Sequence, residues 1–431
     1  MATSRLPERP SSSAPLSDWL RYLEHLHPVA MDFGLARVET VRRALGLRFS
    51  CPVVTVGGTN GKGSTCALLE SILRCAGYRV GCYTSPHLLR YNERVRLDGR
   101  EVDDRCLVNA FECIERTRGD VSLTYFEFGT LAAALLFVQS ALDVVVLEVG
   151  LGGRLDAVNA FDADCAVITS IGLDHQAYLG DTREMIGAEK AGIFRSGRPA
   201  IIADPEPPAS LLERADQIGA QVQLIERDFG AVPQGAQWTY WSTATRRAGL
   251  PWPSLRGSYQ LLNAAAALAA LDSLRARIPV DMGAVRRGLV EVELPGRFQV
   301  LPGRPVMVLD VAHNPHAAHR LRDAFRSIPG AGRRLAVFAM LRDKDIEGVA
   351  RVMADTVDAW FLAPVPGLRG ADNDLLQAAL RACAVRPEAQ GVYADVASAL
   401  HAARESAAPD DKIIVFGSFL TVSAAMSALT S

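Results

Sequence analysis

The sequence predicts an α/β protein built on parallel sheets, and two features of the chain lead to this prediction. Short apolar runs rich in valine and isoleucine, such as residues 53–56 and 143–148, are typical of strands buried on both faces. Segments with a helical spacing of apolar residues lie between these runs. With 431 residues, 49% of them hydrophobic, the chain is long enough for two or three domains with large cores.

The expected elements alternate along the first part of the chain. Strands are expected at 53–56, 79–83, 143–148, 166–171 and 200–203, with a further β region up to residue 250 that carries Trp and Tyr. Helices are expected at 16–26, 38–45, 64–76, near 103–117, 127–140 and 208–218, after Thr182, and in the alanine-rich stretch 257–270.

The domain boundaries follow from breaks in this alternation. Residues 1–15 are rich in Ser and Pro and predict a disordered tail. The stretch Pro295-Gly-Arg-Phe-Gln299 interrupts the pattern, so we expect an N-terminal domain at 16–296 and a smaller, Rossmann-like α/β domain at 297–431. Strands of the second domain are expected at 306–311, 335–339, 359–363, 391–393 and 412–416.

Composition excludes several classes of protein. The net charge is −2 and basic residues do not cluster, which disfavours a nucleic-acid partner. The eight cysteines form no CxxC pair, so neither a zinc site nor a disulfide framework is indicated. Because no signal peptide or membrane-spanning run is found, we expect a cytoplasmic protein without a membrane partner, and we expect it to be a monomer.

A glycine-rich loop follows the first buried strand. Gly57, Gly58, Asn60, Gly61 and Gly63 crowd into seven positions before a helix. Glycines let backbone N–H groups converge, and a helix N-terminus favours negative charge, so this segment predicts a phosphate-binding loop. Lys62 would supply a cation to the phosphates, and the hydroxyl of Ser64 or Thr65 could bind Mg²⁺.

The spacing of this loop differs from the standard phosphate-binding loop. The standard pattern has a glycine where this chain has Val56, and Ser or Thr directly after the lysine, where this chain has Gly63. The structural alternative is a glycine-rich turn with an incidental lysine.

Polar residues follow the other strands expected in the same sheet. Glu148 ends the strand 143–148, as an acid that holds Mg²⁺ does in nucleotide-binding proteins, although an acid facing solvent would fit the same pattern. Thr84-Ser-Pro-His87 ends the strand 79–83, where α/β folds bind ligands. His175 follows the strand 166–171 and is either a metal ligand or a structural histidine.

Two further features are less decisive. Asn263 is a poor helix former inside an alanine-rich helix, which indicates a polar role. His313, His316 and His319 would share one helix face, but no carboxylate or cysteine accompanies them at ligand spacing, so a metal site is not expected there. Together these residues predict an enzyme that uses ATP, and they leave open whether it is a kinase, an NTPase motor or a ligase.

Seven motifs, in order, resemble the folylpolyglutamate synthase/dihydrofolate synthase family over roughly residues 30 to 420. They are Gly58-Thr-Asn-Gly-Lys-Gly-Ser64, Thr84-Ser-Pro-His87, Glu148-Val-Gly-Leu-Gly-Gly-Arg-Leu-Asp156, Leu173-Asp-His175, Glu189-Lys-Ala-Gly-Ile193, Pro295-Gly-Arg-Phe298 and Asp310-Val-Ala-His-Asn-Pro315. The related Mur ligases share the loop and the architecture. They usually have Ser or Thr directly after the lysine and an additional N-terminal domain, for which this chain has no room.

The resemblance implies a fold and a reaction. The fold would be a Mur-ligase-like ATPase domain with a phosphate-binding loop, followed by the smaller α/β domain. The enzyme would be an ATP-dependent amide ligase that adds L-glutamate to dihydropteroate, and to tetrahydrofolate and its polyglutamates. The folate carboxylate would attack the γ-phosphate of ATP, and the glutamate amino group would then attack the resulting acyl phosphate. Two Mg²⁺ ions would take part.

The resemblance also implies residue roles. Gly61, Lys62, Gly63 and Ser64 would hold the ATP phosphates, and Asn263, Arg297 and Asp310 would also contact ATP. Metal ligands would be Ser64, Ser85, Glu148, His175 and Lys190, and residues on the pterin side would be Asp32, Phe33, Thr84, Phe126 and Leu155. The catalytic residues would be Lys62, His175 and Lys190.

Lys190 and Asp32 carry the most specific implications. The lysine that matches Lys190 is typically carbamylated in this family, and the carbamate would bind a second Mg²⁺ near His175; the alternative is a surface lysine in a helix. The segment Met31-Asp-Phe-Gly-Leu35 resembles the border of the dihydropteroate pocket in bifunctional members, and the alternative is that it only caps the next helix. A regulatory module that binds ATP without turnover is the alternative to an enzyme.

Overall fold

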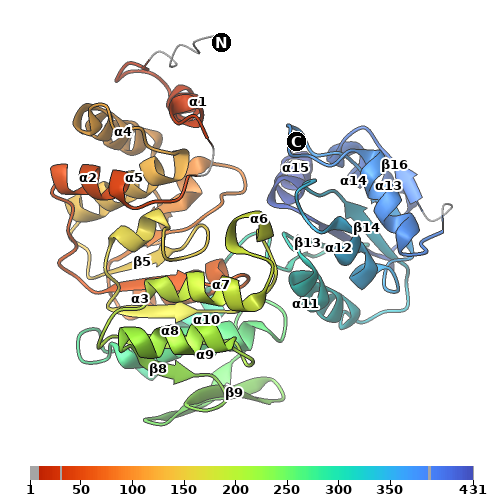
Figure 1. Ribbon diagram of the computed structural model, residues 1–431. Coiled ribbons are helices and arrows are strands. Elements are labelled where there is room, and N and C mark those ends of the chain that lie inside the picture. The colour runs from red at the N-terminus through yellow and green to blue at the C-terminus, as the bar shows by residue number, and fades with distance from the viewer. Residues whose placement is uncertain (1–8, 30–31, 387–389, 431) are drawn as a thin grey trace. The chain divides into compact units, whose positions relative to one another are not determined.

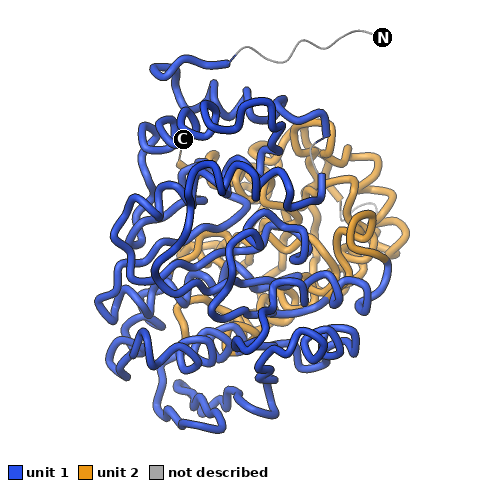
Figure 2. The backbone as a smooth tube through the Cα atoms, turned by 60° about the vertical axis from the view of Figure 1, so that its left-hand side comes forward, with its two compact units in different colours: residues 1–171, 181–252, 262–292 blue, residues 172–180, 253–261, 293–431 orange. Residues whose placement is uncertain are grey.

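The computed structural model describes residues 9–29, 32–386 and 390–430. The chain forms two compact units (Figure 2). Unit 1 comprises residues 1–171, 181–252 and 262–292, and unit 2 comprises residues 172–180, 253–261 and 293–431. This division differs from the predicted boundaries of 16–296 and 297–431, because three short segments of the first predicted domain, residues 172–180, 253–261 and 293–296, belong to unit 2.

Unit 1 is built on an eight-stranded sheet in the order β4-β3-β2-β5-β1-β6-β7-β8. Its strands are β1 (Val53–Gly57), β2 (Val80–Tyr83), β3 (Val95–Leu97), β4 (Arg100–Glu101), β5 (Val144–Glu148), β6 (Cys165–Ile168), β7 (Pro199–Ile202) and β8 (Gln221–Leu224). β1 pairs in parallel with β5 and β6, and every residue of β1 and β5 is buried. The apolar runs of the sequence therefore form the centre of a parallel sheet, as predicted.

Helices surround this sheet (Figure 1). They are α1 (Leu16–Leu26), α2 (Ala36–Ala44), α3 (Lys62–Cys75), α4 (Asp104–Arg118), α5 (Tyr125–Gln139), α7 (Arg183–Lys190), α8 (Ala209–Ile218), α9 (Gln260–Ser273) and α10 (Met282–Glu291), with short 3₁₀ turns at Tyr91–Arg94, Ala157–Ala160 and Ala191–Ile193. α3 packs on β1, β2 and β5, and also on α10, while α1 and α2 pack on α4 and α5. The phosphate loop therefore leads into a helix that lies against the central strands.

The β region expected before residue 250 forms a separate three-stranded antiparallel sheet in the order β11-β10-β9. The strands are β9 (Phe229–Gln234), β10 (Gln237–Ser242) and β11 (Arg246–Pro251). Trp238 and Tyr240 of β10 are fully buried, and the indole N–H of Trp238 donates to the carbonyl of Pro251 at 2.8 Å. These aromatic side chains anchor the small sheet.

Unit 2 is built on a six-stranded sheet in the order β12-β13-β17-β14-β15-β16. Its strands are β12 (Gln299–Leu301), β13 (Val306–Asp310), β14 (Arg334–Phe338), β15 (Ala359–Leu362), β16 (Gln390–Val392) and β17 (Lys412–Phe416). Its helices are α6 (Gln176–Leu179), α11 (Pro315–Arg326), α12 (Ile346–Met353), α13 (Asn373–Ala382), α14 (Val396–Ser406) and α15 (Phe419–Thr430). The short antiparallel β12, which begins at the end of the stretch that interrupts the sequence pattern, was not expected.

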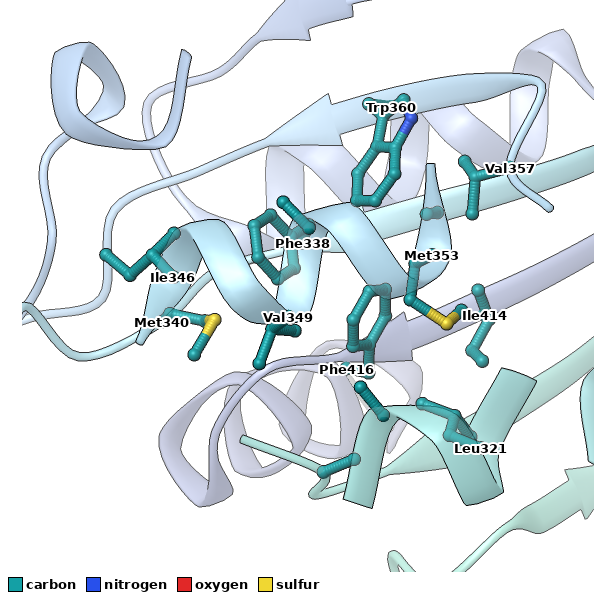
Figure 3. Packing of buried hydrophobic residues seen from close by; sticks show 14 of the residues in the cluster. Leu321, Phe338, Met340, Ile346, Val349, Met353, Val357, Trp360, Ile414 and Phe416 are labelled. Carbon is teal, nitrogen blue, oxygen red and sulfur yellow. The ribbon is translucent and has the colours of Figure 1, made fainter. Parts of the chain in front are cut away.

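Aromatic rings pack among aliphatic side chains in the core of unit 2 (Figure 3). The rings of Phe338 and Phe416 lie 5.0 Å apart between centroids, and those of Phe338 and Trp360 lie 5.4 Å apart. Val349 and Met353 of α12 pack over them and are fully buried. This core fixes the parallel strands whose ends carry the motif residues of unit 2.

Part of the segment predicted as a disordered tail makes defined contacts. The carbonyl of Ser11 accepts the indole N–H of Trp19 at 3.3 Å, and the carbonyl of Ser12 accepts from Arg105 Nη1 at 2.9 Å. The first half of the predicted tail, residues 1–8, lies outside the described residues. Within the part of the chain that is described, no helix is both long enough and apolar enough to cross a membrane.

Candidate active site

The glycine-rich loop connects β1 to α3, and two of its glycines are required by their surroundings. Gly58 has φ +142°, and a Cβ there would lie 2.0 Å from Thr169 Oγ1. Gly61 precedes α3 with φ +92°, and a Cβ there would lie 2.6 Å from Asn263 Oδ1. The loop thus has the backbone conformation that only glycine adopts readily, and it places Asn263 beside the start of α3.

Two hydroxyl groups at the end of β6 hold this loop. Thr169 Oγ1 and Ser170 Oγ both donate to the carbonyl of Asn60, at 2.7 and 2.9 Å, and Thr59 N–H donates to the carbonyl of Ser170 at 2.7 Å. The strand was expected to continue to residue 171. In the structure β6 ends at Ile168, and the next two residues bind the loop. Two hydroxyl residues directly after a buried strand were the signal for this role.

Lys62 and Lys190 converge on one backbone carbonyl. Lys62 Nζ donates to Gly58 O at 3.1 Å and to Thr59 O at 3.2 Å. Lys190 Nζ donates to the same Gly58 O at 3.0 Å and lies 3.5 Å from Gly152 O. Lys190 is only 4% exposed, so the alternative of a surface lysine is wrong. The loop is therefore flanked by two cations.

The acid predicted to bind metal lies at the same edge of the sheet. Glu148 ends β5 and is 3% exposed, which excludes the alternative of an acid facing solvent. Its Oε2 atom accepts from Ser85 N–H at 3.1 Å. Ser64, in the first turn of α3, is 2% exposed. Because β2, β5 and β1 are neighbours in the sheet, Glu148 ends the central one of three adjacent strands, and Ser85 and Ser64 come after the carboxyl ends of the other two.

The residues expected on the pterin side all belong to unit 1. Asp32 Oδ2 accepts from Arg37 Nη1 at 2.6 Å and lies 3.4 Å from His27 Nε2, while Phe33 is 37% exposed. Thr84 Oγ1 accepts from Arg96 Nη1 at 3.3 Å. The helix α2 begins after Leu35, which provides no side-chain cap, and Asp32 bonds to Arg37, the second residue of this helix.

Phe126 and Leu155 come from segments that meet. A Cβ at Gly150 would lie 2.5 Å from the ring of Phe126, so this ring packs on the glycine-rich turn after β5. Leu155 is half-buried in that turn, next to Asp156, which accepts from the backbone N–H groups of Leu151 and Val158. Burial raises the pKa of Asp156 to about 6, although backbone N–H groups and the charge of Lys190 act in the opposite direction.

The other predicted site residues belong to unit 2. The guanidinium carbon of Arg297 lies 4.7 Å from the ring centroid of Phe419. Asp310 ends β13, is 6% exposed and accepts from the N–H groups of Phe298 and Ala312, each at 2.7 Å. Burial raises the pKa of Asp310, with Arg297 the strongest opposing influence. His175 precedes α6 with φ +52°.

Asp174 forms a cluster that the sequence did not predict. Its Oδ1 atom accepts from Lys344 Nζ at 2.5 Å, and its Oδ2 atom accepts from Asn314 Nδ2 at 3.0 Å and lies 3.3 Å from His313 Nε2. Burial alone would raise the pKa of Asp174, but His313 and Lys344 outweigh it and hold this pKa well below its ordinary value. Lys344 Nζ also lies 3.2 Å from His175 Nε2.

His313 has partners at both ring nitrogens. Its Nδ1 atom lies 2.8 Å from the carbonyl of Val311, and its Nε2 atom faces Asp174. Among the described residues, no group of three or more His, Cys, Asp or Glu side chains has the arrangement of a metal site. Any Mg²⁺ site in unit 1 would therefore include hydroxyl groups, a modified side chain, water or substrate beside Glu148.

The predicted site residues are thus divided between the units. The phosphate loop, Ser85, Glu148, Lys190 and Asn263 lie in unit 1, as do all five residues of the pterin side. His175, Arg297 and Asp310 lie in unit 2.

The fold and the phosphate loop define the class of protein as a Mur ligase. The family model described as the Mur ligase middle domain matches residues 56–271, and the model described as the Mur ligase, glutamate ligase domain matches residues 296–419. The chain is 46% identical to the dihydrofolate synthase/folylpolyglutamate synthase of Escherichia coli (strain K12), over 97% of each chain. It is 42% identical to the protein of the same name from Haemophilus influenzae, over 95% of this chain and 97% of the relative.

The chain therefore belongs to the dihydrofolate synthase/folylpolyglutamate synthase family, and it is a ligase. Solved structures of members of this family have the same fold as this chain. E. coli FolC in complex with DHPP and ADP matches with a TM-score of 0.93 and 46% identity, over 98% of this chain and 99% of that one. The Yersinia pestis bifunctional enzyme, complexed with AMPPNP and a Mn ion, matches with a TM-score of 0.91 and 46% identity, over 98% and 100%.

Proposed function

We propose that this ligase uses ATP to join L-glutamate to dihydropteroate, and to tetrahydrofolate and its polyglutamates. The observation that carries the proposal is the full-length similarity to relatives that bear both synthase names, on a chain that buries Glu148 and Lys190 at the phosphate loop. Related structures contain ADP with DHPP, or Mn, AMPPNP and L-glutamate, which are the classes of ligand this reaction needs.

The reaction needs charge neutralisation more than it needs a new nucleophile. A folate carboxylate attacks the γ-phosphorus of ATP and ADP leaves; the glutamate amino group then attacks the acyl carbon and phosphate leaves. The N–H groups at the start of α3 and the Lys62 ammonium would stabilise the phosphates, because both lie at the loop. Asn263 lies against Gly61, at the start of α3. The resemblance implies that Arg297 and Asp310, which belong to unit 2, also bind ATP.

The residues of unit 1 fit a divalent cation. A buried carboxylate beside a phosphate loop, with the hydroxyl groups of Ser64 and Ser85 following neighbouring strands, is the hard oxygen donor set that Mg²⁺ prefers. The N–H of Ser85 fixes the orientation of the Glu148 carboxylate. When bound, Mg²⁺ would neutralise phosphate charge and orient the γ-phosphate.

A carbamate on Lys190 would resolve an electrostatic conflict. Two ammonium groups share the Gly58 carbonyl, and one of them is buried. The Lys190 ammonium group first loses a proton; addition of CO₂ to the neutral amine then forms an N–C bond and releases a second proton, so that a cation becomes an anion. The carbamate would attract Lys62 rather than repel it, and its oxygens could bind a second Mg²⁺. Glu148 is the one carboxylate in the set of metal ligands described above for unit 1, so a carbamate would supply the second anionic ligand.

Measurement of ADP release tests the function directly. The purified protein is assayed with dihydropteroate and with tetrahydrofolate in parallel, each with and without L-glutamate. We expect ADP release with both folates, and amide product only when glutamate is present. Nucleotide binding without turnover on either folate would overturn the ligase function and indicate a regulatory module. Turnover with tetrahydrofolate alone would overturn only the dihydropteroate activity.

A further inference from the structure

Arg37 stands at a position where a cation is unfavourable. It is the second residue of α2, and the N-terminus of a helix carries partial positive charge. The residue before the helix, Leu35, contributes no side-chain cap. The reason for an arginine at this position must therefore lie outside its own helix.

The guanidinium group of Arg37 joins two acidic residues far apart in sequence. Nη1 donates to Asp32 Oδ2 at 2.6 Å and Nη2 donates to the Asp32 carbonyl at 2.8 Å. Nη2 and Nε also donate to the two carboxylate oxygens of Glu127, at 3.0 and 3.3 Å. Three nitrogens of one side chain thus donate hydrogen bonds to two acidic residues. The planar guanidinium group of arginine permits this arrangement, and the single ammonium group of lysine does not.

Glu127 is a rigid partner. Its side chain is 5% exposed, and it forms a capping box in which Oε2 accepts from Thr124 N–H at 2.7 Å and its own N–H donates to Thr124 Oγ1 at 3.2 Å. This box begins α5, whose second residue is Phe126. Arg37 therefore ties the backbone and the side chain of Asp32 to the first turn of the helix that carries Phe126; α2 also packs on α5 (Figure 1).

We propose that Arg37 is a positioning residue that sets where Asp32 stands relative to Phe126, and thereby favours dihydropteroate over tetrahydrofolate. This inference rests on the proposed function and on the placement of Asp32 and Phe126 on the pterin side, which the family resemblance implies. His27 lies 3.4 Å from the same oxygen of Asp32, and this is the one contact between these two described residues. Arg37, in contrast, binds both Asp32 and Glu127. The orientation of Asp32 thus depends on Arg37 more than on any other described residue.

The two folates depend differently on this position. Dihydropteroate ends at a benzoate carboxylate, whereas tetrahydrofolate extends several bonds further to a glutamate carboxylate. If both place the reacting carboxylate at one point, their pterin rings cannot occupy the same place. Asp32 belongs to the segment that resembles the border of the dihydropteroate pocket in bifunctional relatives, so we expect its displacement to weaken binding of that substrate more.

The test compares Arg37→Gln, Arg37→Lys and a matched control, Arg43→Gln, which lies on the same helix with its side chain 75% exposed. Steady-state kinetics with each folate give KM and kcat separately. We expect Arg37→Gln to raise KM for dihydropteroate about 10-fold, as for one lost charge-assisted hydrogen bond, and to raise KM for tetrahydrofolate much less. Arg37→Lys should restore only part of the loss, and Arg43→Gln should match the wild type.

A double-mutant cycle separates positioning from general destabilisation. If Arg37 acts through Asp32, then Asp32→Asn alone raises KM for dihydropteroate about as much as Arg37→Gln, and the double variant is no worse than either single variant. Should Arg37→Gln fail to fold, Asp32→Asn and Arg37→Lys still report the difference between substrates. Thermal melting of each variant accompanies the kinetics.

Equal increases in both KM values, no increase, or fully additive losses in the cycle would overturn the role of Arg37 while the ligase function stands. Wild-type protein that turns over tetrahydrofolate but not dihydropteroate would overturn the inference together with the dual-substrate function. Wild-type protein inert toward both folates would overturn the proposed function itself.

Discussion

Lys62 and Lys190 donate to the same carbonyl oxygen, that of Gly58, at 3.1 and 3.0 Å. Because both ammonium groups touch one atom, they lie no more than about 6 Å apart, and their repulsion is on the order of 3 kcal/mol at an effective dielectric constant of about 20. A bound anion, or conversion of one cation into an anion, would relieve this repulsion. The proximity of Lys62 and Lys190 at the phosphate loop is therefore a physical reason to expect a carbamate on Lys190.

Lys62→Ala should remove nearly all turnover without unfolding the protein. The side chain bonds only to loop carbonyls among its described hydrogen-bond partners, so the melting temperature should stay near that of the wild type. Loss of a cation that stabilises the transferring phosphate should lower kcat by about 10²- to 10³-fold. Arg74→Ala is the matched control, because Arg74 lies on the same helix α3 with its side chain 44% exposed. A near-normal rate in Lys62→Ala would refute the role.

Lys190→Ala should lose activity that bicarbonate cannot restore. Wild-type protein stripped of CO₂ should lose activity in the same way and regain it when bicarbonate is added, because the carbamate reforms on the lysine. A crystal structure grown with Mg²⁺ provides the direct measurement. Unmodified density at a well-ordered Lys190 beside bound metal would contradict the carbamate.

Glu148→Gln should weaken divalent-cation binding while keeping the local structure. An amide oxygen can still accept from Ser85 N–H, but the negative charge that attracts the cation is gone. We expect Mn²⁺ affinity, measured by calorimetry with a non-hydrolysable ATP analogue, to fall by at least about 100-fold. Asp143→Asn is the control, because Asp143 precedes the opposite end of β5 and its side chain is 43% exposed. Unchanged Mn²⁺ affinity in Glu148→Gln would exclude the acid as a ligand.

Asp32→Ala should reduce dihydropteroate activity more than tetrahydrofolate activity. The carboxylate could accept from a pterin amino group and ring N–H, and its removal also frees Arg37 from one of its two acids. The comparison is kcat/KM for each folate under the same conditions. Equal losses with both substrates would show that Asp32 serves the common site or only the stability of unit 1.

Asp411→Asn should make the free energy of unfolding of unit 2 depend less on pH in the acid range. Burial alone would raise the pKa of Asp411, but hydrogen bonds from Ala408 N–H and from Arg333 outweigh it and lower the pKa below its ordinary value of 3.8. A lowered carboxyl pKa stabilises the fold above the unfolded value, and this contribution is lost as pH falls through the folded value.

The wild type should therefore be more stable than Asp411→Asn by about 1–3 kcal/mol at pH 7, and the difference should shrink below about pH 4. Calorimetric melting between pH 3 and pH 7 measures it. Asp410→Asn is the control, because the neighbouring Asp410 is exposed. A constant difference across this range would show that the charge of Asp411 is not the cause.

Sequence reasoning succeeded where the signal is local. The valine-rich runs at 53–56 and 143–148 became β1 and β5, and the glycines between β1 and α3 have conformations that other residues rarely adopt. It was less accurate where an element ends. The strand expected to reach residue 171 stops at Ile168, and the hydroxyl groups of Thr169 and Ser170 donate to the carbonyl of Asn60 in the phosphate loop.

The sequence by itself determined the class of fold, the phosphate loop and the ligase family, because periodicity and motif order are properties of neighbouring residues. The tertiary structure alone decided that Lys190 is buried against Gly58, that Arg37 joins Asp32 to Glu127, and that residues 172–180 and 253–261 pack with unit 2. These partners lie far apart along the chain, and only the packing of the sheet and its helices brings their polar groups within hydrogen-bonding distance.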